Sequence, residues 1–202
     1  QGERGGRERR VRAVSSTRLD TWLDSGRTRG SENLSTVFCL AYARGCCPCG
    51  AQCDYLHRVP NAVDDVKRSM SEDCFGRPKH AAEREDNTGT GSFLRDSTCL
   101  FVFWGGHKLP GERVQEMVER DFSEFGPVSD VYVKAQNTIA FVRYVFRSSA
   151  EFAMQAMDNQ VLVGSGATEP LSVRWANDDP NPVAIARLQR QREELLAERV
   201  ER

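Results

Sequence analysis

The chain of 202 residues lacks any long hydrophobic run and is poor in lysine. No apolar stretch approaches the ~18 residues that a membrane-spanning helix requires, so we expect no membrane partner. Only four of its 28 basic residues are lysines, and the rest are arginines. Arginine holds phosphates through paired hydrogen bonds and stacks on bases, so this bias favours RNA as a ligand. Codon bias is the alternative explanation for the excess of arginine over lysine.

Signatures of catalysis are also missing. The sequence has no glycine-rich phosphate-binding loop followed by lysine, and no Ser/His/Asp pattern beyond chance. His80 and His107 are isolated, and the spaced Cys and His residues are too few for the two-zinc ligand set of a RING-type ubiquitin ligase. We therefore expect a binding protein, without enzymatic activity or a small-molecule substrate.

The cysteine pattern points to a metal. Seven cysteines are an odd number, and the sequence opens on polar residues without an apolar signal segment. Both features argue against a disulfide framework. The spacing Cys39-x7-Cys47-x5-Cys53-x3-His57 can close a tetrahedral shell around one Zn²⁺, and four protein ligands make such an ion structural. Cys46 and Cys49 compete with Cys47 in the turn, but the spacing favours Cys47.

Aromatic and basic residues surround these ligands and suit single-stranded RNA, because rings stack on bases and guanidinium groups hold phosphates. The candidates within the finger are Tyr42, Arg44, Tyr55 and Arg58. Residues 1–58 contain ten arginines against six acidic residues, and Arg27 and Arg29 belong to this excess. The finger region is therefore expected to supply most of the phosphate contacts.

Composition divides the chain into four parts. Residues 1–74 form a basic region around the finger at 39–57, with a short helix near 62–70. Residues 1–35 are expected to be either a disordered basic arm or an irregular layer held by the zinc site. Residues 75–97 are rich in Gly, Asp, Glu, Thr and Ser and are interpreted as a linker. Residues 98–177 form an ordered domain, and residues 178–202 form an extension with a helix.

The ordered domain shows the periodicities of an α+β fold. Strand-like runs are expected at 99–104, 128–133, 139–146 and 171–175. One helix is expected to open at Pro110-Gly111, and a second to be capped by Ser148-Ser149. The resulting order, βαββαβ, is that of the split-βαβ sandwich.

Two of these strands resemble the signature strands of the RNA recognition motif (RRM). Leu100-Phe101-Val102 matches the first-strand pattern, RNP2, and the run from Asn137 to Tyr144 matches the third-strand pattern, RNP1. Strand alternation sends one set of side chains toward the helices, namely Leu100, Val102, Ala140, Val142 and Tyr144. It sends the other set to the open sheet, namely Phe101, Phe103, Ile139, Phe141 and Arg143.

A sheet with Phe101 and Phe141 side by side is a stacking platform for two bases. Arg174, on the fourth strand, is expected to join these RNA contacts. Asn137, Thr138 and Ile139 replace a basic residue, a glycine and an aromatic of the RNP1 pattern, which predicts weakened binding by the sheet. The alternative is an RRM whose sheet packs on protein.

The whole arrangement resembles the Cwc2 family of pre-mRNA splicing factors of the NineTeen complex, over residues 15 to 185. The matching stretches are the finger from Phe38 to Pro48, the segment from Cys53 to Pro60, and the exit from Arg174 to Pro182. The resemblance implies a "torus" domain around the finger, which grips RNA together with the RRM. It implies a nuclear protein that contacts U6 small nuclear RNA, the intron near the 5′ splice site and other spliceosomal proteins, and helps hold the catalytic RNA in its active shape.

Other interpretations stay open at this point. The chain could be a scaffold whose RRM sheet and C-terminal helix dock protein partners. The apolar stripe of that helix is thin, so it could equally be solvated. A cytoplasmic mRNA regulator or a small-subunit splice-site factor would usually carry paired fingers, and only one finger is present.

Overall fold

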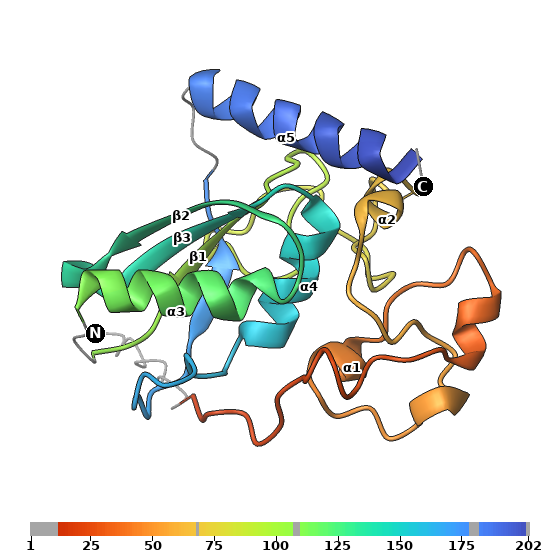
Figure 1. Cartoon of the computed structure of the whole chain (residues 1–202), viewed down its shortest axis with the longest axis horizontal. Coiled ribbons are helices and arrows are strands. Elements are labelled where there is room, and N and C mark those ends of the chain that lie inside the picture. The colour runs from red at the N-terminus through yellow and green to blue at the C-terminus, as the bar shows by residue number, and fades with distance from the viewer. Residues whose placement is uncertain (1–11, 68, 107–109, 178–181, 201–202) are drawn as a thin grey trace, which may run out of the picture.

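The computed structural model describes residues 12–67, 69–106, 110–177 and 182–200. A four-stranded sheet with two helices on one face forms one part, and loops with very short helices form the other (Figure 1). The expected basic arm before residue 12 and the exit segment 178–181 lie outside the described residues.

The sheet confirms the expected α+β fold. Its strands are β1 (Cys99–Phe103), β2 (Val128–Lys134), β3 (Ile139–Tyr144) and β4 (Ser172–Trp175), in the antiparallel order β2-β3-β1-β4. The helices α3 (Gly111–Ser123) and α4 (Arg147–Met157) complete the order βαββαβ. The third strand ends two residues earlier than expected.

The alternation of side chains across the sheet is also confirmed. Every residue expected to face the helices is fully buried: Leu100, Val102, Ala140, Val142 and Tyr144. Tyr144 keeps its hydroxyl satisfied by donating a hydrogen bond to the Phe122 carbonyl at 2.6 Å. The face away from α3 and α4 is called the open face below.

Where the structure describes it, the N-terminal part contains only short helices: η1 (Arg29–Glu32), α1 (Leu40–Ala43), η2 (Gly50–Gln52) and α2 (Ala62–Lys67). Helix α2 begins where the Asn61 side chain accepts a hydrogen bond from the Val63 amide, and it ends three residues before the expected boundary. At Gly45, φ is +67° and a Cβ would lie 2.4 Å from the Arg18 carbonyl carbon. Only glycine allows the chain to turn so close to its own backbone.

The expected serine cap of α4 is wrong. Helix α4 already begins at Arg147, with Phe146 at the N-cap position. The Ser148 amide instead donates a hydrogen bond to the Asp65 carboxylate at 2.9 Å. A carboxylate from α2 therefore caps α4, which local sequence patterns do not reveal.

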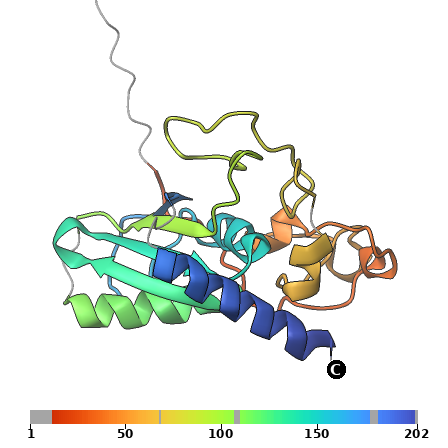
Figure 2. The same cartoon turned by 90° about the horizontal axis from the view of Figure 1, so that it is seen from above.

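Residues 75–97 form irregular loops that extend from the sheet and helices (Figure 2), but buried contacts tie them to the rest of the chain. Beside them, the Cys74 amide donates a hydrogen bond to Glu151 at 2.8 Å. The Lys79 ammonium lies 3.2 Å from the same carboxylate. The Arg147 guanidinium donates to the Ser97 carbonyl at 2.6 Å and stacks over the Trp175 ring. Buried ion pairs thus anchor a segment whose polar composition indicated a linker.

One aromatic cluster joins the two parts of the molecule. The Phe152 ring, on α4, lies 6.0 Å from Phe38 and 6.1 Å from Tyr42, both in the N-terminal part. It also lies 5.8 Å from Phe75 and 6.0 Å from Phe125 of the RRM. These residues belong to a single continuous core, so the two parts are packed as one body.

The first described residues run along the RRM as a strap. The Nη2 atom of Arg12 donates to both carboxylate oxygens of Asp158 at 2.6 Å. The Ser15 amide then donates to the Asn159 carbonyl at 2.8 Å, and Arg18 donates to the Val161 carbonyl at 2.9 Å. This part of the chain is therefore an irregular layer held by the RRM.

The C-terminal helix α5 (Pro182–Val200) docks on its own chain. Leu195 and Leu196 pack against a small cluster of Ala62, Val145 and Phe146. Arg192 pairs with Asp65 at 2.6 Å. Within the described part of the chain, no helix has the length and hydropathy to cross a bilayer.

Candidate metal centre and nucleic-acid interface

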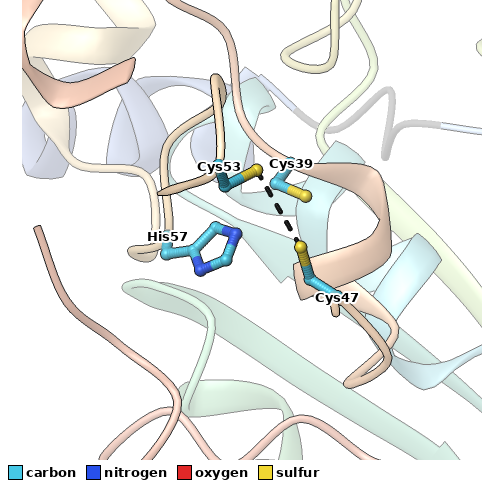
Figure 3. A group of neighbouring side chains, drawn as sticks. All are labelled: Cys39, Cys47, Cys53 and His57. Atoms are coloured by element: carbon cyan, nitrogen blue, oxygen red, sulfur yellow. Dashed lines mark hydrogen bonds between the residues drawn. The ribbon is translucent and has the colours of Figure 1, made fainter. Parts of the chain in front are cut away.

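The four expected zinc ligands converge at one point (Figure 3). Cys39 precedes α1, Cys47 lies in the turn after it, Cys53 follows η2 as its C-cap, and His57 follows a short loop. Their potential ligand atoms all lie within 4.8 Å of one another, and the Sγ atoms of Cys47 and Cys53 are 3.9 Å apart. Tetrahedral Zn–S bonds of about 2.3 Å would place two sulfurs about 3.8 Å apart.

The chemistry of this cluster fits Zn²⁺. The Nε2 atom of His57 is buried and has no hydrogen-bond partner, which a metal bond would supply. Burial lowers the pKa of His57, so the imidazole is neutral and available as a ligand. Burial also raises the pKa of Cys39 to about 12, so metal binding must release its proton. Cys46 and Cys49 are exposed and lie outside this four-residue cluster.

Tyr42 does not occupy the position expected of an RNA contact. Its side chain is only 2% exposed, and its ring stacks on His57 with centroids 4.7 Å apart and an interplanar angle of 12°. Its hydroxyl lies 2.6 Å from the Ser25 hydroxyl. The ring therefore packs on a candidate metal ligand and cannot offer a face to a base, because tertiary packing covers its face and its hydroxyl.

The other finger candidates divide into engaged and exposed groups. Arg58 is bidentate to Asp64 at 2.6 and 2.7 Å, and Arg44 donates to Gln155 at 2.8 Å. Arg29 pairs with Asp54 on the surface. Arg27 is exposed, and Tyr55 is 50% exposed. Arg58 and Arg44 thus form contacts within the chain, but Arg44 is exposed, as are Arg29, Arg27 and Tyr55.

The open face of the sheet presents the expected aromatic pair. Phe101 and Phe141 are directly opposite each other on β1 and β3, with ring centroids 5.7 Å apart at 71°. Arg174 is opposite Phe101 on β4, and its guanidinium lies 5.6 Å from that ring. Phe103, one row away, is 37% exposed. Arg143 lies opposite Asp130 on β2.

Tyr132 is an aromatic residue of this face that was not among the predicted contacts. It lies opposite Phe141 on β2, 56% exposed, with ring centroids 6.4 Å apart at 27°. Strand alternation around Val131 and Val133 would have assigned it to the open face. Tyr132, Phe141, Phe101 and Arg174 together form one row across all four strands, called the aromatic row below.

Two family models match parts of the chain. Residues 1–77 match the Torus domain, and residues 108–165 match the RNA recognition motif. The chain is 42% identical to the pre-mRNA-splicing factor cwf2 of Schizosaccharomyces pombe over 188 residues, covering 93% of this chain and 46% of that protein.

Two further relatives show the same pattern. Identity is 41% over 181 residues to cwc2 of Dictyostelium discoideum, covering 89% of this chain and 33% of that protein. It is 38% over 208 residues to CWC2 of Saccharomyces cerevisiae, covering 93% and 59%. The chain thus spans about half the length of these curated relatives. With its Torus domain and RNA recognition motif, it belongs to the Cwc2/cwf2 family of pre-mRNA-splicing factors.

Proposed function

We propose that this chain binds single-stranded RNA on the open face of its sheet and acts without chemistry of its own in pre-mRNA splicing. The observation that carries the proposal is the pair Phe101–Phe141 beside Arg174. Both rings are half-buried on the open face. Rings on the open face of such a sheet stack bases, and a neighbouring guanidinium holds a phosphate. The relatives named as pre-mRNA-splicing factors supply the setting.

The finer assignment follows the family resemblance. The RNA would be U6 small nuclear RNA together with the intron near the 5′ splice site. NineTeen-complex and other spliceosomal proteins would be the partners, and the nucleus the location. By holding two single-stranded segments at once, the protein would help keep the catalytic RNA in its active conformation.

Zinc has a structural part in this proposal. Bound by Cys39, Cys47, Cys53 and His57, it would supply the cross-link that orders the loops of the Torus domain. The Torus domain carries four exposed candidates for RNA contact, namely Arg27, Arg29, Arg44 and Tyr55. Phosphate contacts from the finger and stacking on the sheet would then act on one rigid body.

Binding titrations of the full chain test the proposal. Phe101→Ala and Phe141→Ala should each weaken binding of a U6 transcript by ~1–3 kcal/mol, because a stacking surface is lost. Val183→Ala removes an exposed apolar side chain on α5 and should bind like the wild type. An unrelated single-stranded RNA of equal length, compared by competition, tests the preference for U6.

Wild-type affinity in both phenylalanine variants would contradict RNA binding by the sheet. It would favour the scaffold alternative, in which the open face docks a protein. The C-terminal helix gives that alternative little support, because Leu195 and Leu196 already pack against the chain itself.

A further inference from the structure

We infer that Tyr132 is a third stacking position, so that bound RNA runs across the strands along the aromatic row. The inference rests on the proposed function. It adds the direction in which the RNA crosses the sheet and one further residue, Tyr132, that stacks on a base. It follows from the register of the sheet, from the exposure of the rings and from one departure in the RNP1 pattern.

The register places the four side chains of the aromatic row in line. Arg174 is paired with Phe101, Phe101 with Phe141, and Phe141 with Tyr132. The next row along the strands contains Ser172, Phe103, Ile139 and Lys134, with a single aromatic ring. Continuous ring surface therefore lies across the sheet and not along β3.

The RNP1 pattern lacks one of its aromatic residues in this chain, and Tyr132 can take over its role in stacking. Ile139 stands where that pattern has an aromatic residue, so the usual third ring on β3 is missing. Tyr132 provides a ring on β2 instead, more exposed than Phe103. An aliphatic side chain at 139 offers no π-face to a base, whereas Tyr132 does.

The ring spacing selects single-stranded RNA. Centroid separations of 5.7 and 6.4 Å exceed the roughly 3.4 Å between successive nucleotides along one strand of a duplex. Neighbouring bases must therefore separate from one another before each can lie on its own ring. At the β4 end, Arg174 closes the row with a positive charge suited to a phosphate.

The test follows the fluorescence anisotropy of a labelled oligouridylate of ten nucleotides as the full chain is added in moderate salt. Tyr132→Ala should weaken binding about five- to tenfold, at the lower end of a stacking loss. Tyr132→Phe, the matched control, keeps the ring and should bind within about twofold of wild type. Ile139→Ala should also stay within about twofold, and thermal unfolding should show all variants folded.

Salt dependence separates stacking from phosphate contact. Tyr132→Ala should leave the slope of log affinity against log salt unchanged, whereas Arg174→Ala should reduce it by about 0.7. Wild-type affinity in Tyr132→Ala, while Phe101→Ala and Phe141→Ala weaken, would overturn the third position and leave the proposed function standing. Equal loss in Tyr132→Phe would assign the contact to the hydroxyl and overturn stacking. A wild-type chain that binds neither oligouridylate nor U6 would overturn both proposals.

Discussion

The two parts of this molecule are held together by different means. The RRM has four paired strands and helices of eleven and thirteen residues over a continuous apolar core. In the described part of the Torus domain, the longest helix has six residues, and strand pairing is limited to isolated bridges such as Phe38 with Leu56. Order in the Torus domain therefore depends on a few groups, and single changes there should have the larger effects.

The largest effect should come from the zinc ligands. Cys39→Ser, Cys53→Ser or His57→Ala should release one equivalent of Zn²⁺ and unfold the Torus domain, since structural zinc contributes on the order of 10 kcal/mol to folding. Elemental analysis and circular dichroism of the purified chain would measure both. Cys49→Ser, which changes an exposed cysteine outside the cluster, should keep the metal. Less than about half an equivalent in wild type would contradict the zinc assignment.

Phe152→Ala should destabilise both parts of the molecule together. The ring is fully buried and touches both of them, so its loss should cost about 3–5 kcal/mol. In denaturant, zinc release and loss of helical signal should coincide, at a lower midpoint than in wild type. Two separate transitions, only one of them shifted, would show that the parts unfold independently.

The same packing affects experiments with separate halves. Residues 1–75 and 95–202 expressed apart would each expose surface around Phe152 and lose the anchored segment between them. We expect each piece to bind a structured RNA weakly, and the intact chain to bind at least about tenfold tighter. Gel-shift titrations at two salt concentrations would compare them, with thermal unfolding as the control for folding. An RRM piece that matches the intact chain in affinity and salt slope would assign the finger to proteins.

A smaller effect should come from the contact between α2 and α5. Asp65→Ala should cost about 2–3 kcal/mol, because a buried carboxylate that caps α4 and pairs with Arg192 is lost. Arg192→Ala should cost about 1 kcal/mol, because its side chain is one-third exposed and Asp65 keeps the α4 amide. Chemical denaturation measures both, and equal losses would mean that the cap contributes little.

The smallest effect should be that of Tyr144→Phe in the RRM core. The change removes the hydrogen bond to the Phe122 carbonyl but keeps the ring, at about 1 kcal/mol. That carbonyl also accepts from the Phe125 amide, so it is not left unsatisfied. A loss above about 3 kcal/mol in the same denaturant assay would mean that the ring has moved.

Local patterns in the sequence predicted the features that depend on residues close together in the chain. Alternation placed Leu100, Val102 and Tyr144 inside the RRM, and ligand spacing brought the Cys39-to-His57 cluster together. Both depend on residues close in sequence or on a regular repeat. The same alternation contained the signal for Tyr132.

The remainder depended on partners distant in the chain. The sequence predicted Tyr42 as a surface aromatic, but in the structure His57 and Phe152 pack against its ring. The sequence predicted Ser148 as a cap of α4, but in the structure the Asp65 carboxylate accepts the hydrogen bond from the Ser148 amide. Residues 75–97 looked like a linker because their polar side chains gave no sign of the buried charges on Lys79, Arg147 and Glu151.

The shared Phe152 cluster has a consequence for synthesis on the ribosome. All four residues of the Cys39-to-His57 cluster are translated well before α4, which carries both Phe152 and the carboxylate of Glu151. At ~5–20 residues per second, the metal site would wait for several seconds before its packing partner emerges. During that interval the nascent Torus domain can hold zinc only through its own loops. Any thiol that has not yet bound metal is then open to oxidation, and Phe38 and Phe75 lack the Phe152 ring that packs on them, until α4 is translated.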